Sequence, residues 1–337
     1  MKYISTISFP GLGIGEFQVT NVAFTVFGID IAWYALIITF GMICCIAYVI
    51  TQAKKIGVTM DDVIDYALFV IPFGVIGARL YYVLTKLEDF DSFWDVINIR
   101  DGGLAIYGGI ILGTITVVVV SRVKKISFFA FGDCVAPGVL LAQGIGRWGN
   151  FMNGEAYGGL YDGFMRMGLQ NVVTKYDEVL IEAGADVSEM VYVHPTFLYE
   201  SLWNLIGVLG VYLFARFVGK KYDGQLILLT FGWYGLGRMM IEGLRTDSLP
   251  IPGTSLRISQ VLAGVIFITF LAMLIFFAIK KPTKPLYKKV VAEGEEKKED
   301  ISFKEFVGKI KSFFAPKSSD NEESKENRNN KSDENKE

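Results

Sequence analysis

Seven long apolar blocks, separated by short charged stretches, dominate this sequence of 337 residues. Hydrophobic residues make up 52% of the chain, and they are concentrated in these blocks rather than spread evenly. Each block has about the 20 residues that a helix needs to cross the hydrocarbon core of a bilayer. We therefore expect an all-α polytopic membrane protein with about seven transmembrane helices. The blocks cover roughly residues 26–50, 63–84, 103–120, 128–146, 196–217, 226–243 and 258–279.

Lys and Arg residues gather in alternate loops. They follow the first, third, fifth and seventh blocks, whereas the loops 86–102, 147–195 and 244–257 are poorer in them for their length. Since basic loops tend to stay in the cytoplasm, the pattern predicts an N-terminus outside the cell and a C-terminus in the cytoplasm.

The remaining segments predict three further parts. Residues 1–25 form an extracytoplasmic or interfacial segment, and residues 155–195, which contain an acidic, helix-compatible stretch at 171–190, form a small extracytoplasmic cap on the membrane domain 26–280. Residues 281–337 form a charged cytoplasmic tail. Apolar residues at helical spacing around 303–314 fit either an interfacial helix or a partly folded tail. Beyond about residue 316 the composition is that of a disordered, dispensable segment.

Polar side chains that are unusual in a bilayer gather at the outer ends of the predicted helices. A charge at the bilayer centre costs about 2.5–3.5 kcal/mol on insertion scales, so such residues usually mark a functional site. Each one taken singly is equally well explained as a membrane anchor. Their coincidence at one leaflet favours a shared site. The residues are Trp33, Tyr34, Arg79, Tyr107, Arg147, His194, Glu200, Arg238 and Glu242.

Residues 234–245 place several of these groups on one helix face. Tyr234, Arg238 and Glu242 follow each other at i, i+4 and i+8, and Arg245 lies seven residues after Arg238. Two arginines on one face need an anion between them. Glu242 is one candidate and a lipid phosphate is another, because the planar guanidinium binds phosphate oxygens in a bidentate manner.

The segment from Gly144 to Gly149 fits the G-x-G-x-x-G pattern of dinucleotide-binding loops. It ends an apolar helical block and follows no strand, so the context that this motif requires is absent. We interpret it as a helix end where small residues allow close backbone approach. Asn150 and Glu155 follow it, and we expect Arg147 to pair with Glu155.

His194 is the only histidine of the chain, and it stands just before the 196–217 block. Two interpretations are open. The first, which we favour, is a residue at a helix start whose ring forms local hydrogen bonds. The second is a general base, since histidine titrates near neutral pH. The Cys and His spacing shows no zinc motif.

Several motifs resemble the prolipoprotein diacylglyceryl transferase family. They are GRWGNFMNGEAYGG at 146–159, GGLAIYGG at 102–109, HPTFLYES at 194–201 and YGLGRMMIEGLR at 234–245, with GARLYYVL at 77–84 and the Trp-Tyr pair of the first block. The resemblance covers most of residues 26–279. It implies a transferase of a non-methyl alkyl group in the bacterial plasma (inner) membrane. Such an enzyme moves the diacylglyceryl group of phosphatidylglycerol to the lipobox cysteine thiol of prolipoproteins, the first step of lipoprotein maturation, and releases glycerol phosphate.

The resemblance also implies roles for individual residues. Tyr107 stands where some members carry a histidine proposed as the base, so the proton acceptor stays open between Tyr107, His194 and a thiol whose pKa the arginines lower. No metal or soluble cofactor is implied, and the expected partners are phosphatidylglycerol, the prolipoprotein signal peptide and membrane lipids, without nucleic acid. The expected catalytic set is Arg147, Arg238, Tyr107, Glu155, Asn150, Glu242, Tyr234 and His194, and the expected phosphatidylglycerol-binding set is Arg147, Arg238, Arg245, Arg79 and Tyr34.

Two other classes of function fit parts of the pattern. A transporter or lipid-binding membrane protein would use the same arginines to hold an anion, but it would need a matching polar set at the cytoplasmic helix ends, which the sequence lacks. A protein-docking scaffold would leave the arginines at bilayer depth unexplained.

Overall fold

The structure is a computed structural model, and it describes residues 4–90, 92–99, 102–170, 180–181, 184–186, 189–246, 251, 254 and 256–280. The predicted cytoplasmic tail 281–337, with its segment 303–314 and the part after residue 316, lies outside the described residues. The same holds for most of the acidic stretch 171–190.

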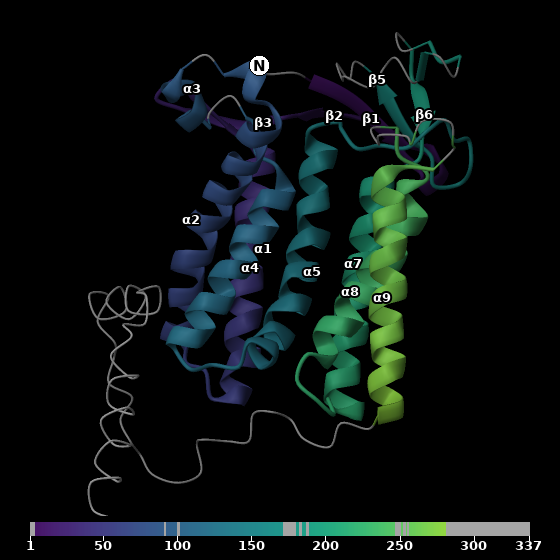
Figure 1. The fold of residues 1–337 in the computed structure, drawn as a ribbon. Helices are drawn as coiled ribbons and strands as arrows, with labels where there is room; N and C mark the ends of the chain where they lie inside the picture. Colours follow the sequence, from purple (N-terminus) through teal and green to yellow (C-terminus); the bar gives the residue numbers. More distant parts are fainter. Residues whose placement is uncertain are drawn as a thin grey trace, which may run out of the picture.

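Long helices run side by side through the described part of the chain (Figure 1). They confirm the prediction of an all-α polytopic membrane protein, and six of them are long and apolar enough to cross a membrane. The helix α8 falls short of that apolarity because it carries Arg238 and Glu242. The long helices are α1 Trp33–Ala53, α2 Met60–Thr85, α4 Ile106–Val123, α5 Phe128–Met152, α7 Thr196–Leu213, α8 Gln225–Glu242 and α9 Ile258–Lys280. The short ones are η1 Pro10–Leu12, η2 Lys54–Ile56, η3 Leu87–Asp89, α3 Phe93–Ile97 and η4 Phe214–Val218.

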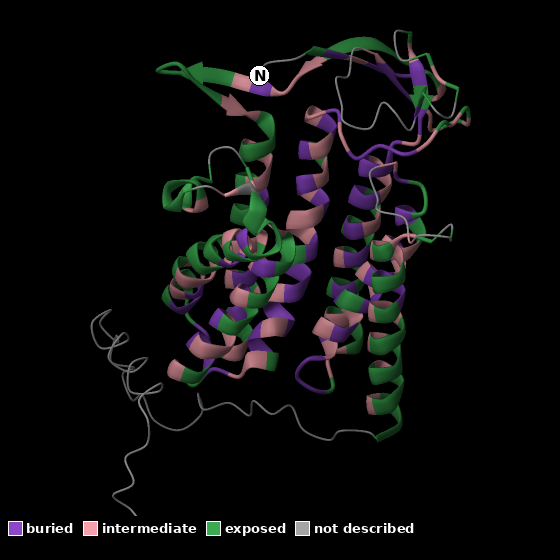
Figure 2. Cartoon of the chain, turned by 45° about the horizontal axis from the view of Figure 1, so that its top comes forward, coloured by how far each residue is buried: buried purple, intermediate pink, exposed green. Residues whose placement is uncertain are grey.

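The helix α5 lies at the centre of the bundle. It packs against α1 on one side and against α7 and α8 on the other, while α2 packs on α4 and α8 packs on α9. Much of the outward surface of these helices is apolar and exposed (Figure 2). Such a surface suits a bilayer rather than water. The strands lie at the same end of the bundle as the N-terminus (Figure 1), which we call the sheet end; the opposite end is the far end.

The N-terminal segment, expected only as an extracytoplasmic or interfacial stretch, forms strands. Antiparallel pairing gives the order β2-β1-β5-β6, so strands from the N-terminus and from the predicted cap build one sheet. A separate hairpin of β3 and β4 precedes α1. The first helix therefore starts later than the predicted residue 26. The strands are β1 Ile4–Phe9, β2 Ile14–Thr20, β3 Val22–Val26, β4 Ile29–Ala32, β5 Met167–Gln170 and β6 Val191–Val193.

A buried cluster joins the sheet to the ends of two helices. Ile7 of β1 and Val193 of β6 pack with Phe151 of α5, Phe197 of α7 and the intervening Tyr157. Burying each large apolar side chain stabilises the fold by about 1.5–3 kcal/mol. The cluster thereby fixes the sheet ends of α5 and α7 relative to each other.

At the far end, one carboxylate fixes the start of α8. Asp133 of α5 accepts hydrogen bonds from the backbone amides of Gly224, Leu226 and Ile227 at 2.9–3.0 Å, and from Lys220 Nζ at 3.2 Å. The first amides of a helix have no partner within the helix, so a side chain from elsewhere caps them here. Asp133 is therefore a paired structural group. Asp65, also at the far end, pairs with Lys124 at 2.6 Å.

Candidate active site

Glu200 lies between three arginines that come from different parts of the chain. Its carboxylate contacts Arg147 Nη2 at 2.6 Å, Arg238 Nη1 at 3.0 and 3.1 Å, and Arg245 Nη1 at 2.9 Å. Only 5% of the Glu200 side chain is exposed. The sequence marked Glu200 as an unusual polar residue but gave it no role. A charge in the first turn of an apolar helix was the signal that could have identified it.

A second carboxylate completes this group. Arg238 Nη2 pairs with Glu242 Oε2 at 2.6 Å, one turn along α8, as the i, i+4 spacing predicted. The Ser259 hydroxyl donates to the Glu242 carboxylate, and Arg257 donates to its backbone carbonyl, so the start of α9 supports this position.

We call Arg147, Glu200, Arg238, Glu242 and Arg245 the arginine–glutamate cluster. Taken by themselves, its three guanidinium groups and two carboxylates carry a formal charge of +1. Buried charges of this kind depend on one another, because removing one partner leaves another unpaired. Arg147 and Arg238 remain partly exposed, so their planar guanidinium groups are suited to bind an additional anion such as a phosphodiester.

Arg147 does not pair directly with Glu155, contrary to the prediction. Arg147 Nη1 donates to Asn150 Oδ1 at 3.4 Å, and Asn150 Nδ2 donates to Glu155 Oε1 at 2.9 Å. Asn153 Nδ2 donates to the same oxygen at 3.2 Å. The α5 helix ends between these residues, so Asn150 bridges the distance that separates Arg147 from Glu155.

Backbone pairing around Gly158 positions Arg245, which lies just beyond the end of α8. Gly158 forms an antiparallel bridge with Arg245, and its amide donates to the His194 carbonyl at 2.9 Å. A Cβ at Gly158 would lie 2.6 Å from the His194 Cβ and 2.8 Å from the Leu244 carbonyl oxygen. Only glycine therefore allows the approach that brings Arg245 to the cluster.

An apolar cavity of about 520 Å³ ends at Arg147 and Asn150. Its lining on α5 runs from Phe131 to Asn150, which at 1.5 Å per residue is about 28 Å, close to the thickness of a bilayer's hydrocarbon core. The lining residues are Tyr34, Ile38, Met42, Cys45, Ile46, Val49, Val63, Tyr66, Ala67, Val70, Ile71, Ile106, Val117, Phe131, Val135, Val139, Ala142, Gln143, Gly146, Arg147, Asn150 and Tyr234.

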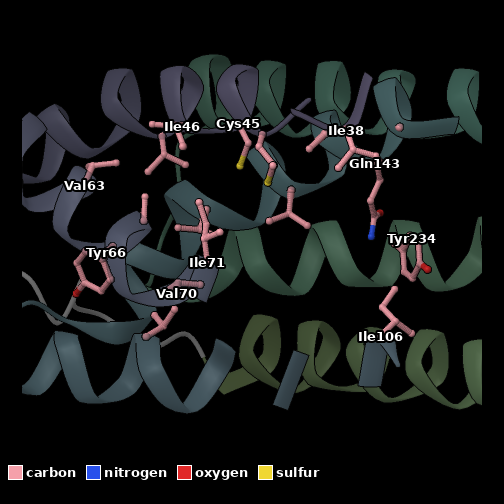
Figure 3. Close-up of a pocket in the computed structure, with 18 of the residues that line it drawn as sticks. Ile38, Cys45, Ile46, Val63, Tyr66, Val70, Ile71, Ile106, Gln143 and Tyr234 are labelled. Atoms are coloured by element: carbon pink, nitrogen blue, oxygen red, sulfur yellow. The ribbon is translucent and has the colours of Figure 1, made fainter. Parts of the chain in front are cut away.

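The polar groups of this cavity are unevenly placed. Figure 3 shows Gln143 and Tyr234 together near one end, with aliphatic side chains between them and Tyr66. Tyr34, a predicted lipid contact, also lines the cavity. Its ring packs close to Gly149, where an added Cβ would lie 2.8 Å from Tyr34 Cδ2. The cavity thus has a polar end near the cluster and a long apolar body.

Two predicted site residues lie elsewhere. Arg79 donates to backbone carbonyls of the segment before α4: Val96 at 2.8 Å, Asp95 at 2.6 Å and Gly103 at 2.9 Å. It holds that segment in place. Tyr107 is 46% exposed, and its ring neighbours Tyr81 rather than the cluster.

His194 makes local contacts. Its ring stacks on Tyr161 with centroids 3.9 Å apart, and its Nδ1 lies 3.3 Å from the Tyr199 hydroxyl. Burial lowers the pKa of His194 below its usual 6.5. In the part of the chain that the structure describes, no hydrogen bond or ion pair joins the ring to the arginine–glutamate cluster.

Comparison with known proteins agrees with the resemblance of the sequence motifs. The sequence model of the prolipoprotein diacylglyceryl transferase family matches residues 21–276. The phosphatidylglycerol–prolipoprotein diacylglyceryl transferase 1 of Clostridium perfringens is 41% identical over 79% of this chain and 98% of its own length. The corresponding transferase of Clostridioides difficile is 43% identical over 73% and 91%, and that of Enterococcus faecalis is 39% identical over 77% and 90%. The matched region contains every residue of the cluster and of the cavity, and the chain therefore belongs to the prolipoprotein diacylglyceryl transferase family.

Proposed function

We propose that this membrane protein transfers the diacylglyceryl group of phosphatidylglycerol to the lipobox cysteine thiol of a prolipoprotein. One observation carries the proposal: a long apolar cavity, whose lining on α5 is about as long as the hydrocarbon core is thick, ends at Arg147 of the arginine–glutamate cluster. A phospholipid has the matching form, with apolar chains and one phosphodiester. The relatives compared above are named for phosphatidylglycerol and prolipoprotein.

The reaction that we propose forms a thioether. The cysteine sulfur attacks the primary glycerol carbon, the bond from that carbon to the phosphate oxygen breaks, and glycerol phosphate leaves with the electron pair. Negative charge builds on the departing phosphate, where preorganised cations stabilise the transition state most. The thiol loses its proton to water, and the positive field lowers the thiol pKa from its usual value near 8.5.

Within the cluster, we assign the phosphate contacts to Arg147 and Arg238. Both side chains keep partial exposure, 20% and 18%, whereas Arg245 is 8% exposed. Glu200 holds both guanidinium groups in one orientation. Glu155 and Asn150 orient Arg147, Glu242 orients Arg238, and Tyr34 and Tyr234 line the cavity beside them.

We further propose that the sheet end faces the outside of the plasma membrane. The basic residues Lys54, Lys124 and Lys220 all lie at the opposite end of the helices, which the positive-inside rule assigns to the cytoplasm. Residues 26–280 then form the catalytic membrane domain, and the sheet covers its outer end.

A transporter would need a second anion site at the far end. The partly buried lysines there, Lys124 and Lys220, already pair with Asp62, Asp133 and Asp223. Lys54 at the same end is exposed rather than part of a buried cluster. This arrangement supports a one-sided enzyme over a transporter.

The test is thioether formation by the purified full-length protein in phosphatidylglycerol nanodiscs. A peptide with a lipobox cysteine is the acceptor, and the same peptide with serine in place of that cysteine is the control. We expect a mass increase of one diacylglyceryl group on the cysteine peptide alone. Binding of phosphatidylglycerol without any such product would contradict the proposal and favour the transporter.

A further inference from the structure

The polarity of the long cavity changes in steps along α5. Arg147 and Asn150 form its charged and polar end, and Val139, Val135 and Phe131 line its deeper part. Gln143 stands between these two groups, one helical turn below Arg147. A charged level, an amide level and an apolar level therefore follow one another in that order.

Gln143 is the only amide side chain at this depth of the lining, and it points into the cavity. Figure 3 shows it extending into the space between α5 and Tyr234 of α8. Within the described residues, no hydrogen bond of the protein satisfies its side-chain amide. An amide that loses water without gaining a hydrogen bond costs about 1–3 kcal/mol in proteins, so a bound ligand that supplies an acceptor gains from its presence.

A phospholipid has its groups in the same order as the cavity. The phosphodiester is followed by the glycerol with its ester carbonyls, and then by the acyl chains. Residues at i and i+4 of a helix have Cβ atoms about 5–6 Å apart. When Arg147 holds the phosphate of a lipid, Gln143 therefore lies beside the part of that lipid only a few bonds away from the phosphate. The side-chain amide of glutamine donates two hydrogen bonds, and an ester carbonyl oxygen accepts them.

We propose that Gln143 is a specificity-determining residue that donates a hydrogen bond to an acyl ester carbonyl of the lipid substrate. The proposal rests on the transfer function proposed above, and it adds a recognition element for the group that is transferred. The hydrogen bond from Gln143 positions the glycerol carbons below the arginine–glutamate cluster. It also makes the enzyme select ester-linked over ether-linked lipid.

The experiment compares two lipids that differ only at these carbonyls. Turnover of the full-length enzyme is measured with diester phosphatidylglycerol and with its dialkyl ether analogue, which has the same head group and chain length but no ester carbonyl. A net hydrogen bond contributes about 0.5–1.5 kcal/mol, so we expect the wild type to favour the diester by about 2- to 12-fold in kcat/KM. Gln143→Met should lower that ratio to near 1, mainly by losing activity on the diester.

The control variant is Leu141→Met, which places the same side chain on α5 at a neighbouring depth but outside the cavity lining. It should keep the wild-type ratio. If Gln143→Met inserts poorly, Gln143→Leu repeats the measurement with another apolar side chain. An active wild type that uses both lipids equally, or a Gln143 variant that loses activity on both lipids to the same extent, would overturn this inference and leave the transfer function standing. A wild type inactive on both lipids would overturn both.

Discussion

At the scale of single residues, the site depends on a carboxylate whose importance the sequence did not reveal. Arg238 and Arg245 were predicted to share an anion, either Glu242 or a lipid phosphate. In the structure they share Glu200, which also contacts Arg147. Sequence spacing showed that Arg238 and Glu242 share a helix face. It could not show that a residue 38 positions away from Arg238 points at the same place, because that depends on how α7 packs on α8.

Replacing Glu200 with glutamine should damage both the fold and the activity. The variant leaves the buried Arg245 and the partly buried Arg147 and Arg238 with one carboxylate, and breaking a buried ion pair costs about 3–5 kcal/mol. We expect a lower Tm in detergent and turnover reduced by at least about tenfold, since each 1.4 kcal/mol corresponds to tenfold. Wild-type Tm and turnover for Glu200→Gln would show that the cluster does not depend on this carboxylate.

His194 gives a prediction about pH. Its pKa is lowered in the folded protein, so the unfolded chain binds a proton more readily, and the stabilisation is present above pH 6.5 and lost as the pH falls through the lowered pKa. His194→Gln should remove this part of the acid dependence of Tm, and it should keep most of the turnover if His194 is not the base. A folded His194→Gln enzyme without activity, together with a wild-type rate that falls as a group with a pKa below 6.5 becomes protonated, would identify His194 as the base.

Tyr107 gives a second prediction about the activation of the thiol. The sequence predicts that Tyr107→Phe costs more turnover than His194→Gln, because we expect Tyr107, a weak base at neutral pH, to hydrogen-bond the leaving phosphate or the thiol. The structure places Tyr107 beside Tyr81 and does not test this role. Turnover of the two variants on one lipobox peptide shows which of Tyr107 and His194 contributes more to the reaction. A larger loss for His194→Gln would contradict the prediction.

At the scale of secondary-structure elements, the helices were predictable and the strands were not. Blocks of apolar residues gave the positions of α2, α4, α7, α8 and α9 to within a few residues, whereas α5 continues to Met152, past its predicted end at residue 146. The strand β1 pairs with β2 on one side and, on the other, with β5, where Ser8 lies opposite Gly168, and short strands carry little signal of their own. The strand β4 was included in the predicted first helix, 26–50, because most of its residues are also apolar, whereas β3 lay almost entirely in the predicted N-terminal segment.

The capping of α8 by Asp133 gives a prediction at this scale. Asparagine in that position keeps one accepting oxygen and removes the charge that Lys220 contacts. Asp133→Asn should lower the free energy of unfolding by about 1–3 kcal/mol, because buried amides and a lysine lose their partner. Turnover per folded molecule at low temperature should stay near the wild-type value, since α8 carries Arg238 at its other end. An unchanged Tm would contradict the capping role.

At the scale of the whole molecule, the order of the helices places every cluster residue at the sheet end. Arg147 and Arg238 lie near the ends of helices that run towards the sheet, and Glu200 lies at the start of one that runs away from it. Hydropathy and charge patterning predicted this convergence correctly. They could not predict the cavity, because its shape arises from the packing of five helices.

The proposed orientation is testable with reporters. A reporter that is active only in the cytoplasm should be active when fused after Lys281 and inactive when inserted in the loop 86–102. The reason is the excess of Lys and Arg at the far end of the bundle. The reverse pattern of activity would overturn the orientation and place the arginine–glutamate cluster on the cytoplasmic side.

The most direct test of the account is the turnover of Arg147→Lys and Arg238→Lys on a lipobox peptide in phosphatidylglycerol nanodiscs. Lysine keeps the charge but loses the planar, bidentate geometry that a phosphate clamp needs. Arg216→Lys is the matched control, because this exposed arginine lies at the far end of the bundle. Both cluster variants should fold and lose most of their turnover, while Arg216→Lys should keep its turnover. Near-normal turnover in both cluster variants would show that Arg147 and Arg238 do not clamp a phosphate.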